Sequence, residues 1–274
     1  VGALAGTSVT TGAQNVLIGG LAGDALTAAD YNVALGTGAL SSDTLGSRSI
    51  AIGQGALGDQ NFTTATDSYN VAVGYTAGLS VTTGIQNTLI GGLAGDSLTD
   101  ADINVAIGMQ SLTADTLGSK SVAVGAYTLI AQNFTTATDT FNTAVGHQAG
   151  GSVTTGTENT LIGGLAGDAL TTGTQNIAIG VNALGSEDTS SYNVAIGREA
   201  LKTQNGGEYN VAVGRTAGML LTTGVQNVLI GAAVGDALTD ADFNTAMGYL
   251  ALSSDTLGSK STAIGYAALQ DQNF

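Results

Sequence analysis

The sequence predicts an all-β protein, a parallel β-solenoid of about fifteen coils with 17 residues in each coil. A five-residue pattern carries the prediction: Asn or Ser, any residue, Ala or Leu, any residue, then Gly, in fifteen copies. Successive copies are 17 residues apart, except for two spacings of 21, from Ser49 to Asn70 and from Ser121 to Asn142. The 274 residues include no Pro, which would remove a ladder hydrogen bond from any internal strand.

Composition narrows the class of protein further. Hydrophobic residues make up 43% of the chain and charged residues only 10%, whereas disordered chains are poor in aliphatic residues and rich in charge. The net charge of −15, with six basic residues, repels nucleic-acid phosphates and anionic membranes. No apolar run reaches the roughly 18 residues that a membrane span needs. We therefore expect no nucleic-acid binding and no membrane insertion in this segment.

A second period groups the coils in fours. NTLIGGLAGDSLT at 87–99 has a close match 72 residues away on either side, and a fourth version follows at 227–239. We expect one repeat domain over residues 1–274, a segment of a longer array, with supermodules at 15–86, 87–158, 159–226 and 227–274. The two long spacings hold a four-residue insertion within QNFTTATD, at 60–67 and at 132–139.

Alternation inside each copy predicts a short strand. The residue after Asn or Ser is Val, Ile or Thr, and the residue two positions later is a large aliphatic. These two share one face because strand side chains alternate. We expect them to form a thin core, and the Ala or Leu between them to point outward toward a second packing surface. The following Gly predicts a sharp corner, and a second short strand is expected to start three residues later.

Stacked coils bring like residues into columns along the solenoid axis. Asn fills the first position of the pattern twelve times and Ser three times. An Asn column can form a hydrogen-bonded ladder between coils. The predicted ladder consists of Asn15, Asn32, Asn70, Asn87, Asn104, Asn142, Asn159, Asn176, Asn193, Asn210, Asn227 and Asn244.

Candidate ligand sites are few. The GGLAG segment at 91–95 looks like the start of a dinucleotide loop, but its recurrence and the absence of a following helix pattern predict a corner instead. The D-x-D-x-N motifs at 100–104 and 240–244 offer oxygen ligands suited to Ca²⁺, and turn chemistry explains the same residues. The candidate Ca²⁺ ligands are Asp100, Asp102, Asp240 and Asp242. No other cofactor is expected.

Few residues offer contact or catalysis. Phe62 and Phe134 lie in the two insertions, either as binding knobs on a protruding loop or as local caps over the coil edge, and capping is favoured. The only His of the chain, His147, follows a corner Gly, and this position predicts that it lies on the surface. No carboxylate pair stands out from the repeats, and we expect no enzymatic activity. No Thr-x-Thr column, as ice binding would use, runs through consecutive coils.

The copies NVAIG at 104–108 and 193–197, SIAIG at 49–53 and SVAVG at 121–125 resemble the repeats in the heads of trimeric autotransporter adhesins. TTGIQNTLIGGLAG at 82–95 is also similar to repeats of phage tail fibres and large bacterial surface proteins. The resemblance covers the whole chain. It implies a left-handed β-roll of three chains side by side, with the mid-strand column near the trimer contact. Four candidate contacts follow: Leu17, Leu89, Leu161 and Leu229.

We therefore expect a non-enzymatic, extracellular structural fibre or adhesin segment on a cell surface or virion. It would act as a stiff rod for attachment or spacing, as a homotrimer or a higher self-assembly, with a host-surface receptor or a glycan as possible partner. Two alternatives remain open. One is a monomeric solenoid that binds glycan or ice directly, and the other is a subunit of a self-assembling filament or sheath.

Overall fold

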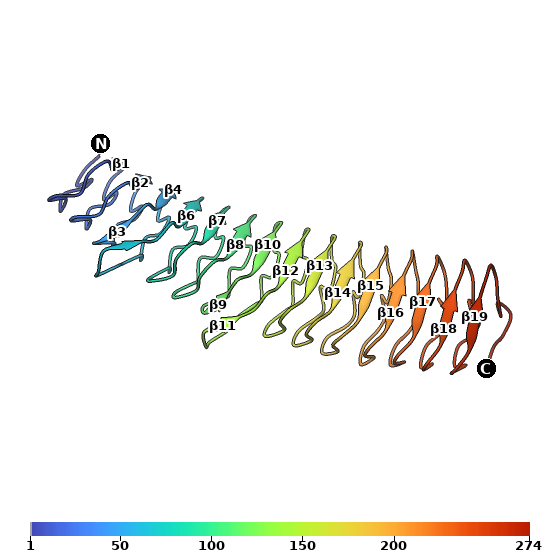
Figure 1. The fold of residues 1–274 in the computed structure, drawn as a ribbon. Coiled ribbons are helices and arrows are strands. Elements are labelled where there is room, and N and C mark those ends of the chain that lie inside the picture. Colours follow the sequence, from blue (N-terminus) through green and yellow to red (C-terminus); the bar gives the residue numbers. More distant parts are fainter. Residues whose placement is uncertain (1) are drawn as a thin grey trace. The chain divides into compact units, whose positions relative to one another are not determined.

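The computed structural model describes residues 2–274 of the chain as strands and turns, with no helix among them. In that range no helix is therefore available to span a membrane. The chain divides into two compact units, unit 1 (Val1–Phe141) and unit 2 (Asn142–Phe274). Each unit is a parallel β-solenoid (Figure 1). The predicted fold class, with about fifteen coils 17 residues apart, is confirmed.

Each coil contributes one three-residue strand, which pairs in parallel and in register with the strand of the next coil. Leu17, for example, lies beside Ala34. Unit 1 contains β1 (Val16–Ile18), β2 (Val33–Leu35), β4 (Ile50–Ile52), β6 (Val71–Val73), β7 (Thr88–Ile90), β8 (Val105–Ile107) and β10 (Val122–Val124). Unit 2 contains β12 (Thr143–Val145), β13 (Thr160–Ile162), β14 (Ile177–Ile179), β15 (Val194–Ile196), β16 (Val211–Val213), β17 (Val228–Ile230), β18 (Thr245–Met247) and β19 (Thr262–Ile264).

The insertions form two small sheets of their own in unit 1. β3 (Gly46–Ser47) pairs with β5 (Thr66–Asp67), and β9 (Gly118–Ser119) pairs with β11 (Thr138–Asp139). The second strand predicted after each corner is absent from residues 2–274, since turns occupy those positions. Small residues there, such as Ala94, are buried in the turns, which explains why the position favours Ala without being a strand.

The corner glycines are required by the close approach of successive coils. At Gly91, φ is +136°, and an added Cβ would lie 2.5 Å from the carbonyl oxygen of Gly108 in the next coil. A side chain would therefore break the stacking. The prediction of a sharp corner is confirmed, and the physical reason is contact between backbones in addition to the positive φ.

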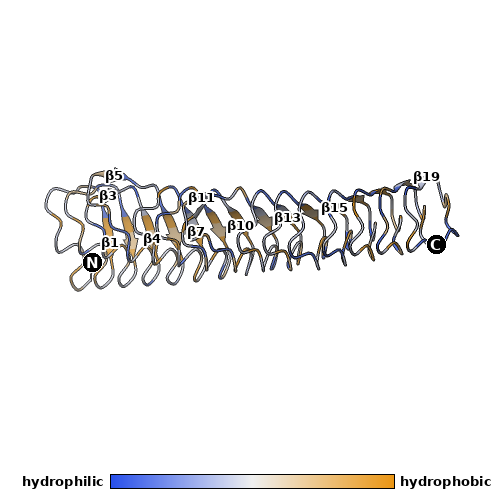
Figure 2. Ribbon diagram, turned by 90° about the horizontal axis from the view of Figure 1, so that it is seen from below, coloured by the Kyte–Doolittle hydropathy of each residue, from blue (hydrophilic) through white to orange (hydrophobic). Residues whose placement is uncertain are grey.

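The predicted inside and outside of the strands are reversed. Mid-strand Ala and Leu residues face the interior, and the Val, Ile and Thr residues on either side of them face outward. Strands such as β1 and β4 carry hydrophobic colouring in Figure 2, although two of their three side chains point away from the interior. The buried Asn decides the direction. It lies two residues before the mid-strand position, so both share one face in a strand of period two.

A complementary Leu and Gly pair explains why Leu replaces Ala in one coil of four. In coils with a mid-strand Ala, the position eight residues after the Asn or Ser is either a Leu, such as the buried Leu112, or Gly. Coils with mid-strand Leu have Gly at that place. A Cβ on Gly95 would come 2.8 Å from a methyl carbon of Leu89, and a Cβ on Gly78, in the preceding coil, 2.6 Å from the other. The two positions fill the same interior volume from opposite walls.

Candidate interaction surface

The first and third side chains of the strands make a largely apolar surface on each unit, which we call the outward face; Thr takes the first position in five of the fifteen strands. The third position is Ile, Val, Leu or Met in all fifteen strands. In unit 1 Ile18 is 43% exposed, and in unit 2 Met247 is 45% exposed. Because stacked strands lie about 4.8 Å apart, these side chains form continuous columns within each unit. Isolated exposed apolar residues are ordinary, but contiguous apolar surfaces mark interaction sites.

The predicted trimer contacts do not lie on this surface. Leu89, Leu161 and Leu229 are fully buried inside their own coils, and Leu17 is half-buried in the first coil. A side chain enclosed by its own chain cannot contact a neighbouring copy. The Leu prediction failed because the sequence pattern defines two faces but does not say which one is inside. The Val and Ile columns, assigned to the core, are the residues that sequence reasoning missed.

The Asn ladder is present in both units and fixes the stacking of the coils. Asn87 donates its amide hydrogen atoms to the carbonyl oxygen of Ala101, with an Nδ2 to oxygen distance of 2.7 Å. Its Oδ1 accepts from the backbone N–H of Asn104 at 3.0 Å. Asn159 and Asn176 are joined in the same way in unit 2. Each side chain therefore links its own coil to the next one, and all but the half-buried Asn15 are buried, where unsatisfied groups would be costly.

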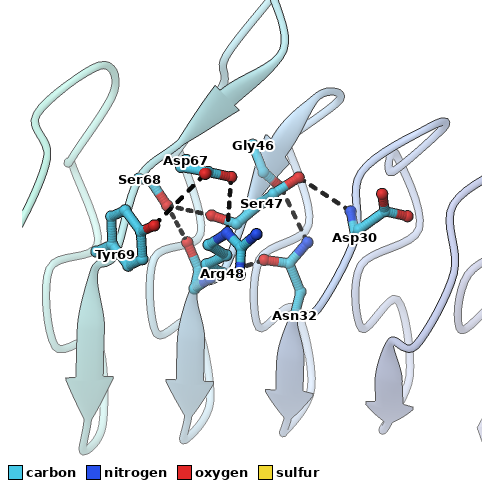
Figure 3. A network of polar contacts seen from close by, with 9 residues as sticks. Asp30, Asn32, Gly46, Ser47, Arg48, Asp67, Ser68 and Tyr69 are labelled. Atoms are coloured by element: carbon cyan, nitrogen blue, oxygen red, sulfur yellow. Dashed lines mark hydrogen bonds and ion pairs between the residues drawn. The ribbon is translucent and has the colours of Figure 1, made fainter.

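At the amino ends of the strands, the residue before each Asn or Ser has a positive φ and is exposed, except for the half-buried Lys120. Arg48 takes this position between Tyr31 and Tyr69, with its guanidinium carbon 4.8 and 5.8 Å from their ring centroids. Its Nε donates to Oδ1 of Asp67 at 3.0 Å (Figure 3). Hydrogen bonding to Asp67 raises the pKa of the Arg48 guanidinium. Asp67 belongs to the insertion, so the inserted residues serve to hold this cation.

The positions equivalent to Arg48 in the second and third supermodules also contact an aromatic ring. Lys120 is paired with Asp139 from the second insertion and lies 5.3 Å from the ring centroid of Phe141. The third supermodule has no insertion and therefore no such carboxylate. A Tyr replaces the cation there, and Tyr192 stacks on Tyr209 with 4.9 Å between ring centroids.

The insertion phenylalanines are not exposed knobs. Phe62 and Phe134 are each only 6% exposed, so the capping interpretation is the one that the structure supports. Phe62 lies beside Gly46, where a Cβ would overlap its ring. The exposed part of the first insertion is formed by residues 63–65 instead. Phe62 and Phe134, which the sequence offered as contact candidates, are therefore caps over the coil edge and are not available to a partner.

A buried carboxylate anchors each of these caps, and no sequence signal had singled it out. Asp43 Oδ1 accepts from the backbone N–H groups of Gly46 and Phe62, both at 3.0 Å, and Oδ2 accepts from Gln60 Nε2 at 2.6 Å. Burial raises the pKa of Asp43 above its ordinary value of 3.8, although these hydrogen bonds act in the opposite direction. The recurrence of Asp and Gln 17 residues apart in Asp115 and Gln132 was the available signal.

The candidate Ca²⁺ ligands are engaged with the preceding coil instead of converging on one point. Asp102 Oδ1 accepts from the backbone N–H of Ile85 at 2.8 Å, and Asp242 Oδ1 accepts from that of Val225 at 2.8 Å. Asp100 accepts from the Thr83 hydroxyl, and Asp240 is bonded to a Thr hydroxyl in the same manner. Within residues 2–274, no three His, Cys, Asp or Glu side chains are grouped to hold a metal ion. Turn chemistry accounts for these residues.

Threonines in the turns also bond along the axis. The Thr99 hydroxyl donates to the carbonyl oxygen of Thr116 at 3.0 Å, and Thr239 does the same to Thr256. These hydroxyls therefore serve the backbone of the next coil. His147 lies exposed just after its corner Gly, as the sequence predicts. No pocket opens anywhere in the described part of the chain.

The chain was compared with protein families, curated proteins and solved structures. No protein-family model, no curated protein and no solved structure matches the chain.

Proposed function

We propose that this chain is a segment of a non-enzymatic extracellular fibre or adhesin that self-associates through its outward face, in the first place as a homotrimer. The observation that carries the proposal is the aliphatic character of all fifteen third-position residues, which are exposed or half-buried in the single chain. Water-facing strand positions normally vary to polar residues. A third-position column that stays aliphatic in every coil is best explained by burial against another copy.

The sequence resemblance supports three copies and an extracellular place. The NVAIG-type copies resemble the repeats of trimeric adhesin heads and of phage fibres over the whole chain. Cyclic symmetry lets one kind of surface be buried equally in every copy. The inverted strand faces change the contact residues of this proposal from the Leu column to the Val and Ile columns. A host-surface receptor or a glycan would then contact surfaces that the assembly leaves exposed.

The mass in solution tests the proposal. The chain of 26.8 kDa would give about 80 kDa as a trimer, three times the monomer mass. We expect light scattering after size-exclusion chromatography to give the trimer mass. Larger masses would favour the filament or sheath alternative, and a monomer mass at micromolar concentration would overturn the proposal.

A pair of variants then assigns the surface. Ile196→Glu places a charge on the outward face of unit 2, and Thr64→Glu places the same charge on the exposed insertion of unit 1. We expect Ile196→Glu to lower the mass toward that of the monomer while circular dichroism keeps its β-sheet signal. Thr64→Glu should leave the mass unchanged. Equal masses for both variants and the wild type would show that the contact lies elsewhere.

A further inference from the structure

The two ends of the strands in unit 2 carry different charges. We call the second residue after each strand the carboxyl edge, and the five residues before each Asn or Ser the amino edge. The carboxyl edge contains Arg198 and Arg215 and no carboxylate. The amino edge contains one cation, Lys260, and five carboxylates: Glu158, Asp188, Glu208, Asp240 and Asp242. Arg198 is paired with the adjacent Glu199, so the outward face of unit 2 has Arg215 as its uncompensated cation on one side and an acidic border on the other.

A ring of parallel copies brings unlike edges together. The strands run across the solenoid axis, so three outward faces turned toward a common parallel axis place the strands around a triangle. At each corner of that triangle the carboxyl end of one strand meets the amino end of a strand from the next copy, at the same coil level. Such a contact is heterologous and closes after one turn. The charges of the two edges are complementary in this arrangement.

At the level of β16 the two edges offer one matched pair. Arg215 follows the strand and is exposed, and Glu208 precedes it and is half-buried. Neither side chain has an ion-pair partner within residues 2–274, whereas Arg198 and Lys202 both pair with Glu199. Six residues lie between the two within one copy, and three of them, Val211–Val213, form the extended strand, so the backbones are at most roughly 20 Å apart at about 3.3 Å per residue. No ion pair joins Glu208 and Arg215 within residues 2–274 of one chain.

We propose that Arg215 of one copy forms an ion pair with Glu208 of the adjacent copy, and that this contact fixes the neighbours at the same coil level. The inference rests on the proposed self-association and adds its geometry: unlike edges meet, in register. A shift by one coil toward the C-terminus would place Arg215 beside 222–226, which holds no carboxylate. The opposite shift would bring Arg215 to Asp188 in 188–192 but would leave Arg198 beside 171–175, which holds none, so only the unshifted register gives both arginines a carboxylate. Charge complementarity of this kind acts mainly on specificity and register.

Charge exchange tests the pair. Arg215→Glu and Glu208→Arg each place like charges at the contact, and the double variant restores an opposite pair in the reverse sense. We expect each single change to weaken association about 3- to 10-fold per contact at low salt. Three contacts in a ring multiply to roughly 30- to 1000-fold in the trimer association constant. The double variant should return to within about threefold of the wild type per contact, and high salt should reduce all differences.

A matched control uses Lys202→Glu, which changes the net charge as Arg215→Glu does but lies away from both edges. It should leave association unchanged. If the wild type is monomeric, the proposed self-association fails. If the wild type is a trimer and Arg215→Glu associates as tightly, or if the double variant is no better than the single ones, the ion pair is wrong while self-association stands.

Discussion

The Leu and Gly pair of the interior gives the sharpest test of the packing. In unit 2, the three atoms nearest to a Cβ built on Gly167 all belong to Leu161, the closest at 2.8 Å. In the next coil the strand carries Ala178 and the equivalent later position carries Leu184, both fully buried. Leu184 has φ of 54° and Gly167 has φ of 57°, so a Leu fits the backbone at this place. The interior volume can therefore be filled from either wall, but not from both.

The magnitudes follow from this exclusion. Leu161→Ala leaves a cavity and should cost about 2–5 kcal/mol of unfolding free energy. Gly167→Leu alone forces a side chain into occupied space, about 1–3 kcal/mol, and adds roughly 1 kcal/mol for a side chain at positive φ. Independent effects would sum to roughly 4–9 kcal/mol. In the double variant the new Leu fills the cavity, so we expect a total cost of only about 1–3 kcal/mol.

Urea unfolding of the wild type, the two single variants and the double variant measures this coupling. Pairing Leu161→Ala with Gly235→Leu provides the control, because Gly235 contacts Leu229 and Leu238 instead of Leu161. Costs in the control pair should add within about 0.5 kcal/mol. Additive costs for Leu161→Ala with Gly167→Leu would refute the claim that the two positions share one volume.

Three further outcomes are expected from single positions. Ile103 is β-branched, has a φ of 59° and is 48% exposed. We expect Ile103→Asn to raise the free energy of unfolding by about 0.5–1 kcal/mol, because Asn tolerates a positive φ better. A lower melting temperature would contradict the strain argument. Asn87→Ala should lower the free energy of unfolding by about 2–4 kcal/mol, because it leaves buried backbone groups unpaired. Asn15→Ala, in the half-buried first position of the ladder, should lower it less. Equal losses of stability would show that burial is not the cause. Since burial raises the pKa of Asp43, its stabilising contribution is present below pH 3.8 and is lost as pH rises through the raised pKa. The unfolding free energy of the wild type relative to Asp43→Asn should therefore fall as pH rises above 3.8, and a rise would reverse the assigned sign.

The fold could be predicted because every coil repeats the same local requirements. Regular spacing, invariant Gly and the absence of Pro each limit the chain to stacked short strands, and the structure has these strands where the pattern places them. The direction of the strand faces could not be predicted from alternation alone. Ala and Leu are compatible with either side, and the deciding fact is the hydrogen bonding of residues such as Asn87, which requires neighbouring coils to be in place.

The candidate sites were harder because their residues meet only between coils. Asp43 and Gln60 are 17 residues apart, and nothing in either local segment shows that they lie in contact. Asp102 looks like a metal ligand within its own motif, whereas its actual partner, the N–H of Ile85, belongs to the preceding coil. From the sequence alone Phe62 looks like an exposed aromatic in a polar loop. In the structure its ring packs beside Gly46, where the missing side chain leaves room for it. Reading the sequence by columns would have paired these residues.

Contacts between coils also explain why sequence changes in neighbouring coils occur together. Asp43 requires Gly46, because a Cβ there would overlap its carboxylate. In the third supermodule Glu187 replaces Asp, the position three residues later is Ser190, and Glu187 Oε1 accepts from the Ser190 N–H at 2.9 Å. The same supermodule lacks the insertion and has Tyr192 in place of a basic residue. In a solenoid each coil contacts only its neighbours, so a change in one coil selects changes in those beside it. Coils that share an interior volume, as at Leu89 and Gly78, or a buried carboxylate, as at Asp43 and Gln60, must therefore vary together.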